Sequence, residues 1–211
     1  MNIKRFFQSV SRGGKMLLGK ATKDVTYSSQ NTFPDRETAV SAFKRSKNKL
    51  FEVNRWSDLS GLTAKFELYD NRGMRSNAKM PQLGYFIRIL LPTPSPENWV
   101  EITDIQENEE MAAFTVNPCN DPQDKDDDID HFFTKESTST FKVELIKNSI
   151  RASEIGKNEG INNQGKDAGE RGVLNTLVAV GGWAAFQKLQ WKKLTAYLVH
   201  KDEIEDNVNA V

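Results

Sequence analysis

The chain has very few of the residues from which disulfides and histidine metal sites are built. Its 211 residues include one cysteine, Cys119, and two histidines, His131 and His200. A single cysteine cannot form an intrachain disulfide, so the sequence favours a reducing, cytoplasmic location. Two histidines cannot build a His-rich metal site, and we expect neither a metal nor another cofactor.

Long apolar runs are also missing. No stretch approaches the roughly 18 residues that a membrane-spanning helix needs. The first twenty residues are basic, as in a signal peptide, but residues 11–15 (SRGGK) interrupt the apolar core that such a peptide requires. With a hydrophobic content of 37%, we expect one buried core together with a good deal of exposed loop.

The net charge is zero, but the charges are unevenly distributed. Residues 1–50 hold eleven Lys or Arg and three acidic residues, whereas residues 97–136 hold thirteen acidic residues and two Lys. Such segments can bind a protein partner or stack copies of the chain, or they can simply be solvated faces. The absence of a nucleic-acid-binding motif argues against a nucleic-acid partner. Contact of residues 1–23 with a membrane surface is a weaker alternative.

Helical and strand periods follow one another along the chain. A helix is predicted from Pro34 and Asp35 to Phe51, and a short helical turn around Trp56 ends at Gly61. Strands are predicted over residues 24–33, 64–70, 83–92, 99–105, 112–118, 131–146 and 150–156. Residues 83–92 are apolar on both faces apart from Arg88, which is typical of a central strand.

The last predicted helix begins near Asp167, where Glu170 completes a capping-box pattern, and runs to about His200. One stripe of this helix carries the residues Val180, Trp183, Ala184, Gln187, Trp191, Leu194 and Leu198. Its wet face is predicted at Lys188, Lys192 and Thr195. A buried Gln187 must find a partner, because an unsatisfied buried polar group costs roughly 1–3 kcal/mol. The partner can be backbone, water, a strand residue such as Arg88, or a ligand.

The order of these elements resembles the helix-grip fold of the START and birch-pollen-allergen superfamily. The resemblance is carried by residues 31–61 (NTFPDRETAVSAFKRSKNKLFEVNRWSDLSG) and 181–199 (GGWAAFQKLQWKKLTAYLV). It implies an α+β fold in which a curved antiparallel sheet packs on a long C-terminal helix. A cavity for apolar or aromatic molecules would lie between the two. We expect a single domain over residues 24–200, a basic arm over residues 1–23 and an acidic tail over residues 201–211.

No motif points to a reaction. Residues 124–130 (DKDDDID) space their first acids like a calcium loop, but Ile129 stands where such a loop needs Gly. Cys119 and His131 make a poor nucleophile and base, because nearby carboxylates raise the pKa of a thiol. The glycine-rich stretches lack the phosphate-loop pattern. The helix-grip family has no universal catalytic motif, so the resemblance implies no catalytic residue, and an enzyme is the less favoured interpretation.

Two functions remain open. The first is a noncatalytic binding module with a cavity for a small apolar or aromatic ligand, in which Gln187 or Arg88 orients the ligand. The residues predicted to line that cavity are Phe66, Phe86, Arg88, Phe114, Phe141, Trp183, Gln187 and Trp191. The alternative is a structural or adaptor subunit of a larger assembly, including a homo-oligomer, with the basic arm and acidic loop as its contacts.

Overall fold

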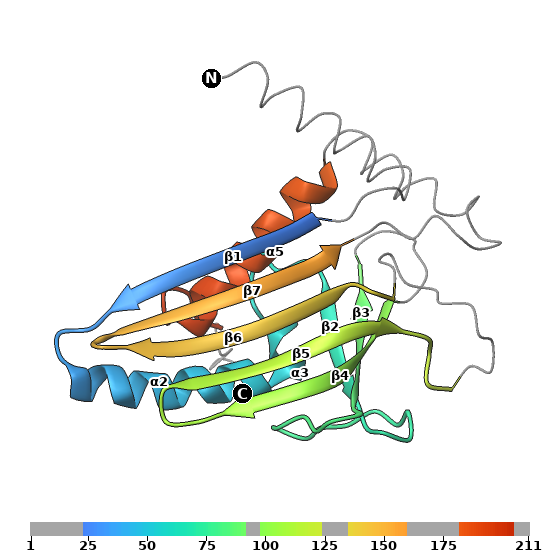
Figure 1. The fold of residues 1–211 in the computed structure, drawn as a ribbon, viewed down its shortest axis with the longest axis horizontal. Helices are drawn as coiled ribbons and strands as arrows, with labels where there is room; N and C mark the ends of the chain where they lie inside the picture. Colours follow the sequence, from blue (N-terminus) through green and yellow to red (C-terminus); the bar gives the residue numbers. More distant parts are fainter. Residues whose placement is uncertain (1–22, 92–97, 124–134, 160–181, 205–211) are drawn as a thin grey trace, which may run out of the picture.

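The computed structural model of the chain describes residues 23–91, 98–123, 135–159 and 182–204, and the side chains of residues 182–186 lie outside this description. The predicted arm before Lys23, the acidic stretch 124–130 and the predicted helix start at Asp167 also lie outside it. The described elements are β1 (Lys23–Thr32), α2 (Arg36–Phe51), α3 (Val53–Trp56), β2 (Lys65–Tyr69), β3 (Phe86–Leu90), β4 (Asn98–Glu107), β5 (Met111–Cys119), β6 (Thr138–Ile146), β7 (Ser149–Glu159) and α5 (Gly182–Leu198) (Figure 1).

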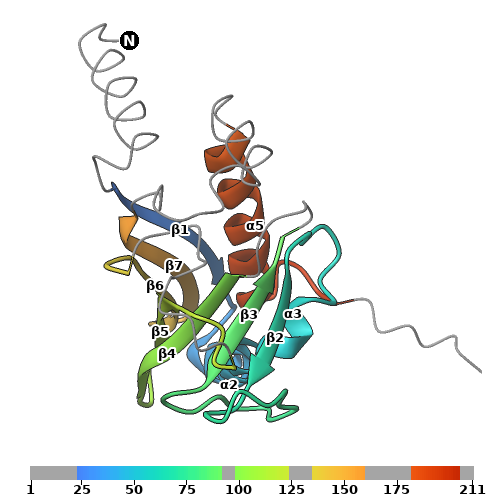
Figure 2. The ribbon, with the colours of Figure 1, turned by 90° about the vertical axis from the view of Figure 1, so that its right-hand side faces the viewer.

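The strands form one seven-stranded antiparallel sheet in the order β1-β7-β6-β5-β4-β3-β2. Each strand from β2 to β7 pairs with its neighbour in sequence, and β1 closes onto the far edge beside β7. The sheet curves around α5, and α2 crosses one end of its concave side (Figure 2). The predicted fold class is therefore confirmed: an α+β fold with a curved antiparallel sheet packed on a C-terminal helix.

The core lies between the concave face of the sheet and the three described helices. Asp35 caps α2 by accepting a hydrogen bond from the backbone N–H of Thr38 at 2.7 Å. From that start, helical spacing turns Ala39, Phe43 and Leu50 into the interior, each no more than 2% exposed. No helix among the described residues is long and apolar enough to cross a membrane.

The end of α5 differs from the prediction in detail. The helix ends at Leu198, and His200 takes a left-handed conformation with φ of 60°. The backbone N–H groups of His200 and Lys201 donate to the carbonyls of Tyr197 and Ala196, which is the hydrogen-bond pattern of a Schellman cap. The His200 ring contacts the Ala42 carbonyl at 3.0 Å, and burial lowers its pKa. The ring therefore joins α5 to α2, and its burial opposes the positive charge that would favour the helix dipole.

The faces of α5 also need one correction. Leu194 and Leu198 are buried as predicted. Thr195, predicted on the wet face, is 1% exposed, and its hydroxyl lies 2.9 Å from that of Ser29 on β1. Leu189, an apolar residue, is 69% exposed. The strand β1 covers the side of the helix that carries Thr195. A short polar side chain at this position does not predict such burial from the sequence.

Candidate functional site

Four of the predicted lining residues come together between the sheet and α5. Phe66, Phe114 and Phe141 project from β2, β5 and β6 and are 1–4% exposed. Their rings surround Trp56 of α3, with centroid distances of 5.1–5.9 Å. Trp191 of α5 closes the cluster at 5.4 Å from Phe141. These rings pack against one another, so the cluster is primarily part of the hydrophobic core.

Phe86 and Arg88 do not belong to this interior, and their assignment to a common cavity is wrong. Side chains alternate across a strand, and Ile87 of β3 is the inward residue at 2% exposed. Phe86 and Arg88 therefore face the convex side. There the Arg88 guanidinium lies 3.3 Å from the Glu67 carboxylate and 6.0 Å from the Trp99 ring.

The remaining two predicted residues lie on α5. Trp183 occupies its first turn, but its side chain is outside the described residues. Gln187 is 6% exposed, and its side chain hydrogen-bonds the carboxyl group of Glu159 on β7. The buried amide thus has a strand partner, as it must, but the partner is an acid that we had not singled out.

Glu154 is a second buried acid on the same strand. It follows Ile150 and Ala152 on the inward side of β7 and is 0% exposed. Cross-strand pairing places it between Tyr27 of β1 and Phe141 of β6. Within the described residues, neither of its carboxylate oxygens makes a well-formed hydrogen bond.

Glu159 reaches the interior through a break in the alternation. Asn158 adopts a left-handed conformation with φ of 52°, and the pairing of β1 with β7 shifts register between Lys23 and Val25. This bulge turns Glu159, 2% exposed, to the same face as Glu154. Its carboxyl group lies over Gly156, where a Cβ would collide with Glu159 Oε1. A glycine at 156 is what leaves room for the acid.

We call Glu154 and Glu159 the acidic corner of the interior. Burial, followed by the charge of Glu159, raises the pKa of Glu154 from 4.5 to about 8, while the Ser139 hydroxyl offsets part of the rise. Burial raises the pKa of Glu159 to about 7 against the opposing effects of Gln187 and Lys23. Burial and the two acids together raise the pKa of Tyr27 to about 12. Both acids are therefore far easier to protonate than surface carboxyl groups.

The sequence carried a signal for one of these acids and not for the other. Side chains alternate between the two faces of a strand, so Glu154 lies on the same face as Ile150 and Ala152. The sequence alone therefore predicts an inward carboxyl group at Glu154. Glu159 falls out of phase unless a bulge is inserted, and neither its position nor the conformation of Asn158 follows from the pattern.

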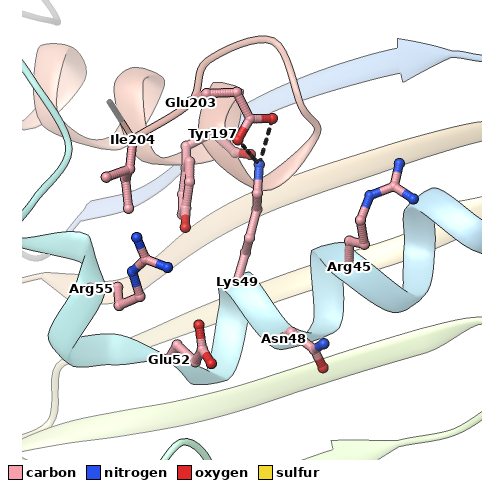
Figure 3. Close-up of a pocket in the computed structure, with 8 residues that line it drawn as sticks. All are labelled: Arg45, Asn48, Lys49, Glu52, Arg55, Tyr197, Glu203 and Ile204. Atoms are coloured by element: carbon pink, nitrogen blue, oxygen red, sulfur yellow. Dashed lines mark hydrogen bonds and ion pairs between the residues drawn. The ribbon is translucent and has the colours of Figure 1, made fainter. Parts of the chain in front are cut away.

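A separate pocket of about 220 Å³ lies on the surface between α2 and the turn after α5 (Figure 3). Its centre is Lys49, whose ammonium group bonds the Glu203 carboxylate at 2.8 Å and the Tyr197 carbonyl at 3.1 Å. The same group lies 4.3 Å from the centre of the Tyr197 ring. Through these contacts Lys49 holds the end of α5 against α2. Because its N–H donors are already used, the pocket is a poor candidate for a ligand site.

The structure gives no support to a catalytic Cys119 or to a metal site among the described residues. Burial raises the pKa of Cys119 to about 12, with Glu101 and Asp121 adding to the rise, so the predicted direction is confirmed. His131 lies outside the described residues. In the part of the chain that the structure describes, no three His, Cys, Asp or Glu side chains gather as metal ligands would.

Comparisons with known proteins leave the family open. No family model matches the chain, and no curated protein matches it by sequence. Among solved structures, a hypothetical protein from Helicobacter pylori is 12% identical with a TM-score of 0.48, over 90% of this chain and 94% of that one. Norcoclaurine synthase from Thalictrum flavum, in complex with a transition-state analogue, is 16% identical with a TM-score of 0.42, over 86% and 98% of the two chains. Likeness at this level carries no argument about function, which therefore depends on the residues themselves.

Proposed function

We propose that the protein is a noncatalytic binding module that holds a small apolar or aromatic ligand between the concave face of the sheet and α5. The observation that carries this proposal is a set of interior polar atoms that make no well-formed hydrogen bond within the described residues: both carboxylate oxygens of Glu154 and Nε1 of Trp191. Each such atom costs roughly 1–3 kcal/mol while it stays unpaired. A ligand with complementary groups removes that cost on binding.

The described residues suggest how such a ligand is held. Trp191 and Phe141 offer apolar and aromatic contact. Gln187 and Glu159, which are bonded to each other, supply the orienting polar group that Arg88 does not. Phe66 and Phe114 lie deeper, packed on Trp56, and support the site from behind.

The first test is native mass spectrometry of gently purified full-length protein, followed by denaturing identification of any bound molecule. A monomer that carries a small apolar or aromatic molecule supports the binding module. A ligand-free oligomer that dissociates in high salt contradicts it and favours the adaptor subunit, because salt screens contacts between oppositely charged segments.

A second test uses Gln187→Leu, which keeps the size of the side chain but removes the amide. The released ligand, or a close analogue, should bind the variant about tenfold more weakly, since loss of one buried polar partner costs roughly 1–3 kcal/mol. Unchanged affinity measured by calorimetry would exclude Gln187 as an orienting residue. Lys188→Leu, at the next position on the exposed side of the helix, is the matched control and should leave affinity unchanged.

A further inference from the structure

A purely apolar ligand would offer no partner to the two carboxyl groups of the acidic corner. Glu154 and Glu159 are 0% and 2% exposed, and they lie close enough for the charge of Glu159 to raise the pKa of Glu154. Buried carboxyl groups are normally paired with a cation or fully hydrogen-bonded. In the described parts of the chain, neither oxygen of Glu154 nor Oε1 of Glu159 makes a well-formed hydrogen bond, and the Ser139 hydroxyl is near enough to act on Glu154 only weakly.

Among the described residues, little positive charge reaches this corner. Lys23 of β1 is the cross-strand neighbour of Glu159 on β7 and lowers the pKa of that acid through its charge, but Lys23 itself is exposed. From the part of the chain that the structure describes, the influences on Glu154 are burial, Glu159 and the Ser139 hydroxyl, and none of these is a cation. The deeper acid is therefore the one that most needs a donor with positive charge.

We propose that the acidic corner recognises the ammonium group of a small organic amine, with Glu154 and Glu159 accepting its N–H groups and the apolar part of the amine lying against Phe141 and Trp191. This inference rests on the proposed binding function and adds the chemical class of the ligand. An ammonium group offers up to three donors and one charge, which matches the open carboxylate oxygens. Hydrogen bonds between ionised partners are about twice as strong as neutral ones.

The aromatic residues near the acidic corner favour an organic cation over a metal ion. Phe141 is the cross-strand neighbour of Glu154, and its ring lies 5.4 Å from that of Trp191. The faces of aromatic rings attract organic cations, whereas Ca²⁺ requires six or more oxygen ligands. Two carboxyl groups beside two aromatic rings supply what an amine needs and fall short of a calcium shell.

The test compares two probes of the same shape on full-length protein by isothermal titration calorimetry: 3-phenylpropylamine, which is charged, and 3-phenylpropanol, which is neutral. We expect the amine to bind about tenfold more tightly or better, as a charge-assisted bond predicts. Glu154→Gln and Glu159→Gln should each weaken the amine by about tenfold and leave the alcohol unchanged.

Two further variants guard against a trivial result. Gly156→Ala displaces the Glu159 side chain without changing any charge, so it should also weaken the amine selectively. Glu144→Gln removes a carboxylate from the outward side of β6, where it pairs with Lys142 at 3.0 Å, and should have no effect on either probe. Selective loss in the first variant and none in the second supports the proposal even if one Glu→Gln variant folds poorly.

The contrary outcomes are distinct. If amine and alcohol bind equally to the wild type and to the Gln variants, the amine inference fails while the binding module stands. If neither probe gives saturable binding, the inference fails, and ligand-free protein in the mass spectra then removes the binding module as well. If CaCl₂ raises the melting temperature of the wild type but not of Glu154→Gln, and no amine binds, the corner is a metal site and the inference is overturned.

Discussion

At the scale of single residues, Glu154 shows how a fold changes the chemistry of a side chain. On the surface its carboxyl group would be ionised above about pH 4.5, whereas burial raises its pKa in the folded state to about 8. A raised pKa means that the folded state holds its proton more tightly than the unfolded state does. The stability linked to that proton is fully present below pH 4.5 and is lost as the pH rises through about 8.

Glu154→Gln should therefore make stability less dependent on pH. In the wild type, the free energy of unfolding should fall by up to about 1.4 kcal/mol per pH unit for each buried acid, until the pH reaches about 7 for Glu159 and about 8 for Glu154. The variant should show a shallower fall, because Gln has no proton to lose and only Glu159 of the two buried acids still contributes to the slope. Urea denaturation at several pH values measures this slope, with Glu144→Gln as a control that keeps the wild-type slope. Equal slopes in wild type and Glu154→Gln would contradict the buried state of this acid.

At the scale of elements, α5 is held in register by polar contacts as well as by its apolar stripe. Gln190, 4% exposed, accepts hydrogen bonds from the backbone N–H groups of Thr63 at 2.9 Å and Ala64 at 3.2 Å, just before β2. On the opposite edge, Asn31 of β1 donates to the Val199 carbonyl at 2.9 Å. The helix is thus bound at both edges of the sheet that surrounds it.

Gln190→Leu should destabilise the fold by about 1–3 kcal/mol, because it leaves the buried N–H of Ala64 without its acceptor. Chemical denaturation measures the loss. The neighbouring Leu189→Gln is the matched control: Leu189 is 69% exposed, so this change should move stability by no more than about 0.5 kcal/mol. A stable Gln190→Leu protein would mean that the amide contributes nothing to the register of the helix.

Elements were easier to predict from the sequence than faces and contacts. Alternation identified β2, β5 and β6 and placed Phe66, Phe114 and Phe141 correctly inside. The same rule was ambiguous for β3, which is apolar on both sides, so Arg88 was assigned to the wrong face. The inward turn of Glu159 needed a bulge that no local pattern specifies. Composition and periodicity thus predict the strands, whereas bulges and cross-strand pairing determine on which face of the sheet a charged side chain lies.

At the scale of the whole molecule, the two faces of the sheet are chemically separate. The concave face carries the aromatic cluster and the acidic corner, while the convex face carries an ion-paired group. There Glu67 meets Arg88 at 3.3 Å and Arg75 at 3.2 Å, and the Tyr69 ring lies 4.7 Å from that of Trp99. The sheet lies between these polar groups and the proposed ligand site beside α5.

Arg88→Leu should accordingly leave ligand affinity within about twofold of the wild type and lower stability by no more than about 1 kcal/mol, the usual value of a partly exposed ion pair. Titration of the variant with 3-phenylpropanol and chemical denaturation measure the two effects. A tenfold loss of affinity without a change in fold would show that the convex face communicates with the interior.

The pairing of β1 with β7 also bears on how the chain is made. The hydroxyls of Thr32 and Ser149 meet at 2.8 Å although the two residues are 117 positions apart. During synthesis, β1 leaves the ribosome long before β7, its neighbour in the described sheet, exists, and the helix that covers its inner face is translated later still. The local meander from β2 to β7 can begin to form on the growing chain, whereas the first-made strand has to wait. The acidic corner, which needs β1, β7 and α5 together, is therefore among the last parts of the molecule to be completed.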